Sequence, residues 1–352
     1  MINTESKSAI KLLKKLIKTP SFSNQEKDVV HILESWFIEN TIIYERHLNN
    51  LWAENKYFDR DKPTILLNSH HDTVKPNKSF TLDPFNPIEK DQKIFGLGSN
   101  DAGGSLVSLL YLFKSMYLNE NMNYNFVIAC TAEEEIAGKN GIKSILKKIP
   151  KIDFGIIGEP TSMKLSIAER GLIVFDATIK GKPGHAAHEN KDNAIEKLPN
   201  ILNWFNQIKF DRVSELLGPV KTTITQINAG YQHNVIPSEV KIVIDVRVNE
   251  LYDIKEINDL FLKECPCEIK PRSLSLKSSS INPNHKIVKS ANFLGIQCYG
   301  SPTLSDQALL NFPSVKIGPG DSKRSHSADE FIYVEEITEG IEVYKKLLNK
   351  II

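Results

Sequence analysis

The sequence predicts an α/β protein in which a separate α+β domain is inserted into a discontinuous α/β domain. At 352 residues the chain is longer than one typical compact domain and accommodates two. Its first half alternates helix-like segments with short apolar segments that are typical of buried strands. Its middle contains segments in which apolar and polar residues alternate, which indicates antiparallel strands with one face in water.

The first part of the chain opens with a predicted amphipathic helix within residues 1–18, whose apolar residues recur on one side. Ser23 and Glu26 have the spacing of a capping box, which predicts that a second helix starts there and runs through Trp36. A third helix is expected at 102–117. Short apolar runs predict buried strands at 64–67, 126–130 and 154–157.

The middle of the chain is predicted to form an α+β domain with an antiparallel sheet and two helices. Alternating residues predict strands at 172–180 and 240–248, and helix-like segments occur at 193–208 and 254–263. The chain then returns to the α/β pattern and ends in an amphipathic helix over 334–352. The predicted boundaries are 1–168 and 280–352 for the discontinuous domain and 169–279 for the insertion.

Composition excludes several classes of function. A formal net charge of +1 disfavours nucleic acid as the main partner, because such binders usually carry a basic excess. No segment approaches the about 20 apolar residues that span a bilayer, and residues 1–18 lack the apolar core of a secretory signal. The four cysteines match neither a zinc ribbon nor a disulfide framework, and Cys265 and Cys267 alone are a weak metal or redox motif. We therefore expect a cytoplasmic protein with reduced thiols and no membrane partner.

Clusters of histidine and acidic residues carry the candidate chemistry, and nearly all come directly after a predicted strand, where open α/β sheets place their sites. His70 and Asp72 suit a metal ligand and the partner that fixes its imidazole tautomer, although a surface pair at a turn is an equal alternative. Three consecutive glutamates at 133–135 favour a nearby cation over a solvated helix start. The five clusters are 69–72, 96–104, 131–135, 158–160 and 325–330.

The glycine-rich cluster at 96–104 resembles a dinucleotide-binding fingerprint, but Asp101 stands where the third glycine would lie. A carboxylate there would repel a pyrophosphate and is better suited to a helix cap or a metal ligand. A dinucleotide-dependent oxidoreductase is thus disfavoured, and no serine-hydrolase elbow or P-loop occurs. Together the clusters offer two histidines and at least three carboxylates, a donor set that suits two zinc ions, or cobalt or manganese.

These clusters, in this order and spacing, resemble the acetylornithine deacetylase / succinyl-diaminopimelate desuccinylase family of two-metal peptidases and amidohydrolases. The resemblance covers nearly the whole chain. It implies a zinc-peptidase-like α/β catalytic domain, with the inserted domain serving as a lid and as the contact of a homodimer. Two divalent metal ions, zinc in the first place, are the implied cofactors.

The resemblance also implies a role for each cluster. His70 and Glu159 match the ligands of one metal, and Asp101 matches the carboxylate that bridges both. Glu135 and His326 match the ligands of the other metal.

Two further carboxylates have implied roles that are not ligation. Asp72 matches the carboxylate that orients the first histidine, and Glu134 matches the general base, a register that the residues alone do not decide. A catalytically inert, metal-stabilised binding protein is disfavoured, because the ligands and this base are all present.

The inserted domain carries three further matches. His185 resembles a histidine that reaches the partner subunit's active site and stabilises the oxyanion, although in isolation it would be an ordinary loop histidine. Asn234 and Arg247 lie in matching segments, and Arg247 would clamp a substrate carboxylate or form a salt bridge on its strand.

The expected reaction is hydrolysis of the amide bond of an N-acyl amino acid. The segments 158–161, 169–171 and 316–330 look most like deacylases of arginine biosynthesis, which act on N-acetylornithine or on N-acetyl- or N-succinyl-citrulline. A succinyl-diaminopimelate desuccinylase, an aminoacylase and a small metallopeptidase are the alternatives within the same chemistry.

Overall fold

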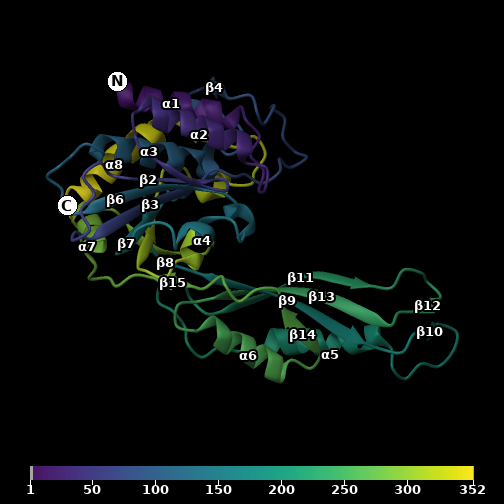
Figure 1. Ribbon diagram of the computed structural model, residues 1–352. Coiled ribbons are helices and arrows are strands. Elements are labelled where there is room, and N and C mark those ends of the chain that lie inside the picture. The colour runs from purple at the N-terminus through teal and green to yellow at the C-terminus, as the bar shows by residue number, and fades with distance from the viewer. Residues whose placement is uncertain (1–2, 352) are drawn as a thin grey trace. The chain divides into compact units, whose positions relative to one another are not determined.

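The computed structural model describes residues 3–351, which form two compact units. Of the described residues, unit 1 comprises 3–167, 280–299 and 305–351, and unit 2 comprises 168–279 and 300–304. The α/β fold class is confirmed, with a mixed sheet in the first unit and an antiparallel sheet in the second (Figure 1).

Nine strands of the described residues form the main sheet, in the order β1-β2-β6-β3-β7-β17-β8-β15, with β16 paired to β8. Its centre is parallel, because β3 pairs with β6 and β7 in the same direction and β7 pairs in that way with β17. The strands are β1 (Glu45–His47), β2 (Asn50–Glu54), β3 (Thr64–His70), β6 (Asn125–Thr131), β7 (Phe154–Ile157), β8 (Leu165–Glu169), β15 (Ser279–Ser280), β16 (Cys298–Ser301) and β17 (Ser314–Lys316).

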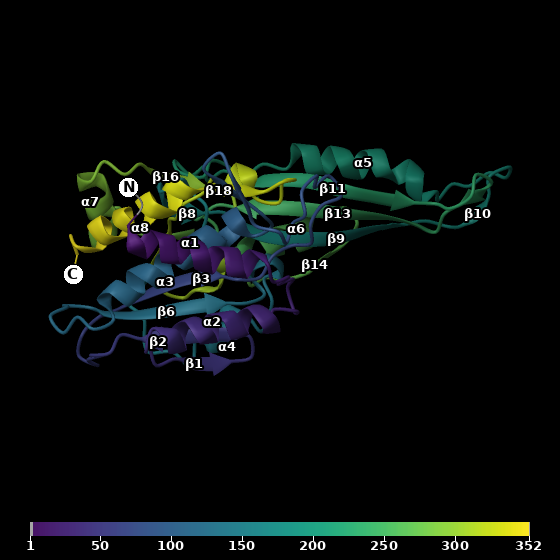
Figure 2. The same ribbon diagram turned by 90° about the horizontal axis from the view of Figure 1, so that it is seen from above.

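The central strands are buried on both faces, which explains their nearly continuous apolar sequences. Along β3, Ile65 and Leu67 join the larger core, whereas Leu66 joins a smaller core on the opposite face. On the face of the sheet that carries the larger core, the helix α3 contacts β3, β6, α1 and α8 (Figure 2). The helices are α1 (Thr4–Ile17), α2 (Lys27–Glu39), α3 (Gly104–Met116), α4 (Ile142–Ile145), α7 (Lys286–Phe293) and α8 (Val334–Leu348).

A small antiparallel sheet lies beside the first turn of α8. Its strands are β4 (Ile88–Lys90), β5 (Lys93–Phe95) and β18 (Phe331–Tyr333), and β18 pairs with β5 through Phe331 and Phe95. This pairing joins the chain just after residue 330 to the chain just before the glycine-rich cluster.

The predicted capping box at the second helix is wrong. Glu26 is the N-cap residue of α2 and makes no side-chain cap. Ser23 instead donates its hydroxyl to Asp72 Oδ2 at 2.7 Å, and Glu26 accepts from Asn24 N and Asn49 Nδ2. Tertiary partners of these side chains therefore outcompete the local motif.

Unit 2 contains the four-stranded antiparallel sheet β11-β13-β9-β14 and two helices. Alternate residues of β9 and β13 are buried against α5 and α6, as their sequence pattern predicts. The elements are β9 (Gly171–Lys180), β10 (Gly184–His185), α5 (Ala194–Gln207), β11 (Lys221–Ala229), β12 (Val235–Ile236), β13 (Glu239–Val248), α6 (Ile254–Glu264) and β14 (Glu268–Pro271).

The core of unit 2 provides a stability prediction. Phe261 is fully buried, and its ring stacks on Phe175 with centroids 4.8 Å apart. Replacing Phe261 by alanine is expected to lower the free energy of unfolding by about 3–5 kcal/mol, because the cavity cannot fully collapse. The neighbouring Leu262, which is 50% exposed, is the control, and its alanine variant should change stability little. Urea unfolding compares the two, and equal losses would contradict this packing.

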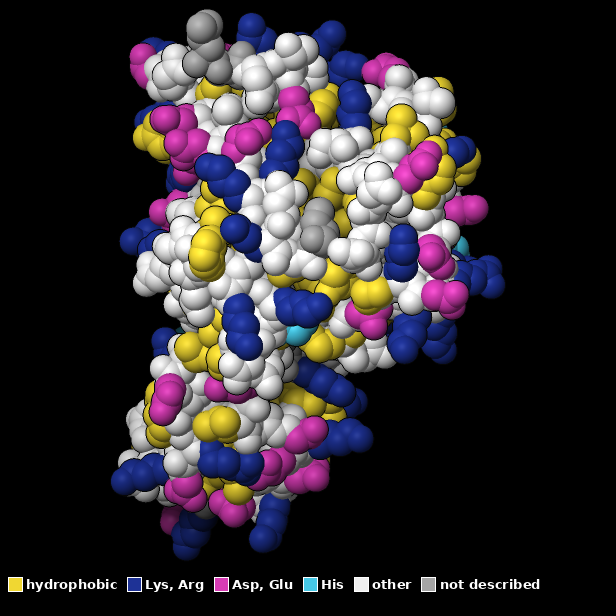
Figure 3. Space-filling view, turned by 90° about the vertical axis from the view of Figure 1, so that its left-hand side faces the viewer, with side chains coloured by type: hydrophobic (Ala, Val, Ile, Leu, Met, Phe, Trp, Pro, Cys, Tyr) yellow, Lys and Arg dark blue, Asp and Glu magenta, His cyan; other side chains and the backbone are white. Residues whose placement is uncertain are grey.

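The surface of the molecule carries charges of both signs. Lysine, arginine and acidic side chains are interspersed over the face shown in Figure 3. Between residues 3 and 351, none of the helices combines the length and the apolar character that crossing a membrane requires.

Candidate metal centre

The central strands of the main sheet bring the predicted ligands to one edge. β3 ends at His70, and the neighbouring β6 is followed by Glu134 and Glu135. On the other side of β3, the strand β7 ends two residues before Glu159. Because the carboxyl ends of adjacent parallel strands meet at the same edge, these side chains converge there.

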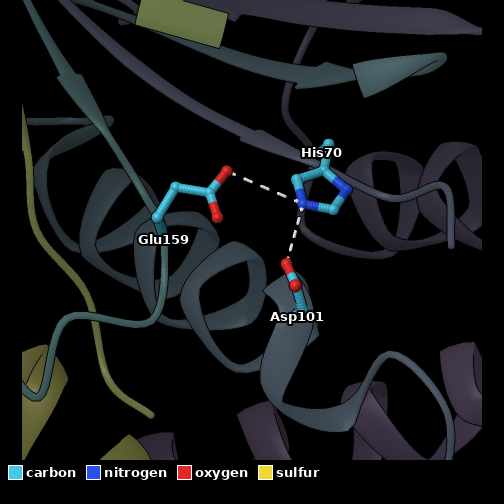
Figure 4. Close-up of side chains that lie close together, drawn as sticks. All are labelled: His70, Asp101 and Glu159. Atoms are coloured by element: carbon cyan, nitrogen blue, oxygen red, sulfur yellow. Dashed lines mark ion pairs between the residues drawn. The ribbon is translucent and has the colours of Figure 1, made fainter. Parts of the chain in front are cut away.

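The first group of candidate ligands consists of His70, Asp101 and Glu159 (Figure 4). His70 Nε2 lies 3.3 Å from Asp101 Oδ1 and 3.6 Å from Glu159 Oε1. The His70 side chain is 1% exposed, so its donor atom faces the two carboxylates rather than bulk water. Three segments distant in sequence thus place one nitrogen and two oxygens around a common point.

The second group consists of Asp101, Glu135 and His326. His326 Nε2 lies 3.0 Å from Glu135 Oε2 and 3.6 Å from Asp101 Oδ2. The hydrogen bond with Glu135 raises the pKa of His326 to about 9. Asp101 therefore contributes one carboxylate oxygen to each group, which is the geometry that a bridging carboxylate needs.

The electrostatics of the first group fit a bound cation. Within residues 3–351, His70 Nε2 and Glu159 Oε1 are buried without a hydrogen-bond partner. Burial raises the pKa of Glu159 to about 8. Burial alone would lower the pKa of His70, but the carboxylates of Glu134 and Glu159 raise it well above its usual value. Carboxylates crowded in this way repel one another unless a cation offsets their charge, and nitrogen with carboxylate oxygens suits zinc-type ions.

Glu134 lies beside the ligands without joining either group. Its Oε2 is 3.9 Å from His70 Nε2, and its side chain is 11% exposed. Burial raises the pKa of Glu134 well above its usual value, and the carboxylates of Glu159 and Asp306 raise it further. A carboxyl group with a raised pKa is suited to accepting and returning a proton near neutral pH.

Asp72 is fully buried and holds two segments of the site together. Its backbone oxygen accepts from His70 Nδ1 at 3.0 Å, whereas its carboxylate oxygen Oδ1 is 3.6 Å from that nitrogen. The carboxylate accepts instead from the backbone N–H groups of Glu134 and Glu135, at 3.0 and 3.2 Å. Asp72 thus sets the orientation of His70 through its main chain and the position of the two glutamates through its side chain.

Two buried carboxylates of the site have no role that the sequence patterns predict. Asp306 lies behind the strand ends, where its Oδ2 accepts from Asn68 Nδ2 at 3.0 Å and from Thr131 Oγ1 at 2.9 Å. Burial raises the pKa of Asp306 to about 6. In the sequence, no apolar strand pattern directly precedes Asp306. The second carboxylate, Glu330, belongs to the acidic cluster at 325–330, but the sequence does not indicate its function.

The remaining predicted residues lie in unit 2. His185 ends β10, which pairs with β12 so that His185 lies opposite Val235, and Asn234 directly precedes β12. His185 Nδ1 accepts from the backbone N–H of Ala187 at 3.1 Å. Arg247, on β13, binds both oxygens of Asp245, at 2.8 and 3.0 Å.

Comparisons with known proteins extend over nearly the whole chain. The sequence model of Peptidase family M20/M25/M40 matches residues 66–350. The succinyl-diaminopimelate desuccinylase of Rickettsia bellii (strain OSU 85-389) is 28% identical over 377 residues, covering 96% of this chain and 95% of that protein.

Solved structures show the same fold. A tripeptidase from Staphylococcus aureus superposes with a TM-score of 0.78 at 22% identity, covering 99% of this chain and 98% of that chain. The YxeP protein of Bacillus subtilis, described as a dinuclear metal binding peptidase from the M20 family, superposes with a TM-score of 0.71 at 18% identity, with 97% of each chain covered.

Two separate findings thus point to the same family. Donor groups of a metal centre converge at the strand ends, and a family model spans residues 66–350. The chain belongs to Peptidase family M20/M25/M40 and is a hydrolase of that family.

Proposed function

We propose that the chain is a two-metal amidohydrolase that hydrolyses the amide bond of an N-acyl amino acid. The observation that carries the proposal is the pair of donor groups that share Asp101. His70 and Glu159 would hold one ion with Asp101, and Glu135 and His326 the other. Zinc is the first candidate because of the mixed nitrogen and carboxylate donors, followed by cobalt and manganese.

Such ions, when bound, supply an acidified water near neutral pH and a Lewis acid for the substrate carbonyl. Glu134 would accept the proton of the attacking water and return it to the leaving amine, for which its raised pKa is suited. Asp72 would hold Glu134 in place through the hydrogen bond to its backbone N–H.

His185 is proposed to donate a hydrogen bond to the oxyanion of the tetrahedral intermediate, across a homodimer. Its Nδ1 accepts a backbone hydrogen bond from Ala187, so in the neutral ring the proton resides on Nε2. Nε2 is then the donor that an oxyanion needs. Replacing His185 by alanine is expected to lower kcat by about 10²–10³-fold. Glutamine, which retains a donor, should recover part of the loss, and a variant as inactive as alanine would argue against hydrogen-bond donation.

Asn234 and Arg247 are the proposed contacts for the substrate. Within residues 3–351, Asn234 Oδ1 is buried without a hydrogen-bond partner, so a substrate donor would satisfy it. Arg247 is already bound by Asp245 through Nε and Nη2, and this pair competes with bidentate binding of a substrate carboxylate. These contacts therefore support the role of Asn234 more strongly than that of Arg247.

An N-succinyl diamino acid is the substrate that the relatives support best, because curated relatives of the chain include succinyl-diaminopimelate desuccinylases at 25–28% identity. The N-acyl derivatives of ornithine and citrulline are the second candidates, because the segments 158–161, 169–171 and 316–330 resemble arginine-pathway deacylases. The two candidates share the reaction and differ in the side chain that the pocket accepts.

A panel of substrates distinguishes the candidates. The acetyl and succinyl derivatives of diaminopimelate, ornithine and citrulline vary the acyl group and the amino acid independently. We expect kcat/KM for one member to exceed that of the others by at least about 10-fold, since a pocket built for one polar side chain rejects another strongly. Turnover of none of them by a protein that holds two ions would overturn the N-acyl amino acid proposal and point to short peptides.

A further inference from the structure

We propose that Glu330 is the positioning residue that fixes Asp101 for metal binding, an inference that rests on the proposed metal centre. Glu330 is 2% exposed. Its Oε1 accepts from the backbone N–H groups of Asn100 and Asp101, at 2.8 and 2.9 Å, and its Oε2 accepts from that of Gly98 at 3.2 Å. One buried carboxylate thus holds three backbone donors of the turn that carries the shared ligand.

This turn is only irregularly helical, because residues Ser99–Gly103 form a short π-helical segment in which the backbone of Asp101 and Ala102 departs from helical dihedral angles. Gly98 adopts a left-handed backbone with φ of 74°, and α3 starts only at Gly104. The N–H groups at the start of such a segment need partners from outside it, and the Glu330 carboxylate supplies them for Gly98, Asn100 and Asp101. The backbone oxygen of Glu330 also accepts from Gly96 N at 2.9 Å, because the pairing of β18 with β5 places the two residues side by side.

The segment that carries Glu330 also carries His326, a ligand of the second group. Other hydrogen bonds hold this segment to the chain at 77–82. Asp329 accepts from Leu82 N at 2.9 Å and from Thr81 Oγ1 at 2.5 Å. Asn77 Nδ2 donates to the backbone oxygen of His326 at 3.1 Å. Glu330 therefore links the two segments that meet at the second ion. A change at Glu330 should affect the relative position of Asp101 and His326.

Glutamine cannot replace this carboxylate. Its side chain has the same length but offers one oxygen, and its NH₂ group would face backbone N–H donors. Glu330→Gln is expected to weaken ion binding by about 10–100-fold, as is typical for residues that support metal ligands, and most strongly at the second ion, because Glu330 links the segments of Asp101 and His326. Glu330→Asp keeps both oxygens one methylene short of the turn and should fall between wild type and glutamine.

The test measures ion binding directly. Zinc affinities of wild type and Glu330→Gln are obtained by competition with a chromophoric chelator, and the visible absorption of the cobalt-loaded proteins reports ligand geometry. The control is Glu335→Gln, an exposed glutamate in the first turn of α8, which should bind both ions as wild type does. The cobalt spectrum separates positioning from a loss of fold stability, because a merely less stable protein keeps the wild-type spectrum.

The outcomes separate this inference from the proposed function. Weaker second-ion affinity and an altered cobalt spectrum in Glu330→Gln support the positioning role. Two ions bound with wild-type affinity and spectrum by Glu330→Gln overturn it and leave the metal centre intact. If the glutamine variant does not fold, the zinc affinity and the cobalt spectrum of Glu330→Asp are compared with those of wild type instead. A wild-type protein that binds fewer than two ions overturns the proposed function instead.

A second inference concerns unit 2, where we infer that Cys265 and Cys267 form a thiol–disulfide couple. Their Sγ atoms lie 3.6 Å apart, and both side chains are half-buried. Both backbones are anchored: Cys265 N donates to Phe261 O at the end of α6, and Cys267 directly precedes β14, which pairs with β9. The hydrogen bond between the two thiols lowers the pKa of Cys265, so we assign Cys265 as the attacking group.

The oxidant is a low-molecular-weight disulfide. The Cys265 thiolate attacks one sulfur of that disulfide and releases one thiol, leaving a mixed disulfide. The Cys267 thiolate then attacks Cys265 Sγ and releases the second thiol, so that two protein thiols are oxidised as one disulfide is reduced. The two sulfurs must approach from 3.6 Å to the length of a disulfide bond, about 2.05 Å.

Mass spectrometry after incubation with glutathione disulfide tests this couple. We expect wild type to lose two hydrogens in the peptide that contains both cysteines and to retain no glutathione there. Cys267→Ser is expected to accumulate the mixed disulfide at Cys265. The half-buried Cys298, whose pKa is raised by burial, is the internal control and should react more slowly. Stable glutathione on Cys265 of wild type, or no reaction at either cysteine, would overturn the inference.

Discussion

Replacing Glu134 by alanine is expected to lower kcat by at least about 10²-fold while leaving both ions bound. The carboxylate of Glu134 lies 3.9 Å from His70 Nε2 and belongs to neither donor group. Its removal takes away the proton acceptor and leaves the ligands in place. Steady-state kinetics and metal analysis of the purified variant measure the two effects separately.

The matched variant is Glu135→Ala, one residue further along the chain. Glu135 Oε2 contacts His326 Nε2 at 3.0 Å, so its removal should deplete the second group of a donor and lower metal content. The two neighbours are thus predicted to fail in different ways. Metal loss in Glu134→Ala, with full occupancy in Glu135→Ala, would show that base and ligand are assigned in the wrong register.

Replacing Asp101 by alanine is expected to weaken the binding of both ions. Asp101 contributes Oδ1 to the group of His70 and Oδ2 to the group of His326. The loss in metal affinity should be larger than the loss of about 10–100-fold that is typical when a residue supporting a metal ligand is removed. Metal titration with a competing chelator measures both binding steps, and Asp28→Ala, at an exposed acid in the first turn of α2, is the control.

Single-group variants sharpen this prediction. Glu159→Ala should weaken mainly the ion at His70, and His326→Ala mainly the ion at Glu135, because each residue belongs to one group. Only Asp101→Ala should weaken both. If Asp101→Ala weakened the binding of one ion and left the other at wild-type affinity, the carboxylate would be a terminal ligand rather than a bridge.

Sequence patterns predicted the parts of this protein that depend on local chemistry. The apolar runs at 64–67, 126–130 and 154–157 correspond to β3, β6 and β7, since strands buried on both faces need continuous apolar residues. The parallel centre of the sheet then brings the residues after each of these strands to one edge. Acidic and histidine residues at those positions therefore predict a candidate site from the sequence alone.

The parts that depend on tertiary partners were not predictable. Ser23 has the spacing of a capping residue but donates to Asp72, a choice that depends on a contact between segments distant in sequence. Glu330 is one acidic residue among several in its cluster, and its role depends on the pairing of β18 with β5. Asp306 accepts hydrogen bonds from Asn68 and Thr131 and lies on a short 3₁₀ helix, for which the sequence shows no periodic pattern of apolar residues.

The most direct test of the central claim is stepwise addition of zinc to the chelated protein, with bound metal and amide hydrolysis measured at each step. The two donor groups predict no hydrolysis by the chelated protein, and recovery that is complete when two ions are bound per chain. Full hydrolysis by the chelated protein, or complete recovery in Asp101→Ala at the same zinc concentrations, would contradict the two-metal account.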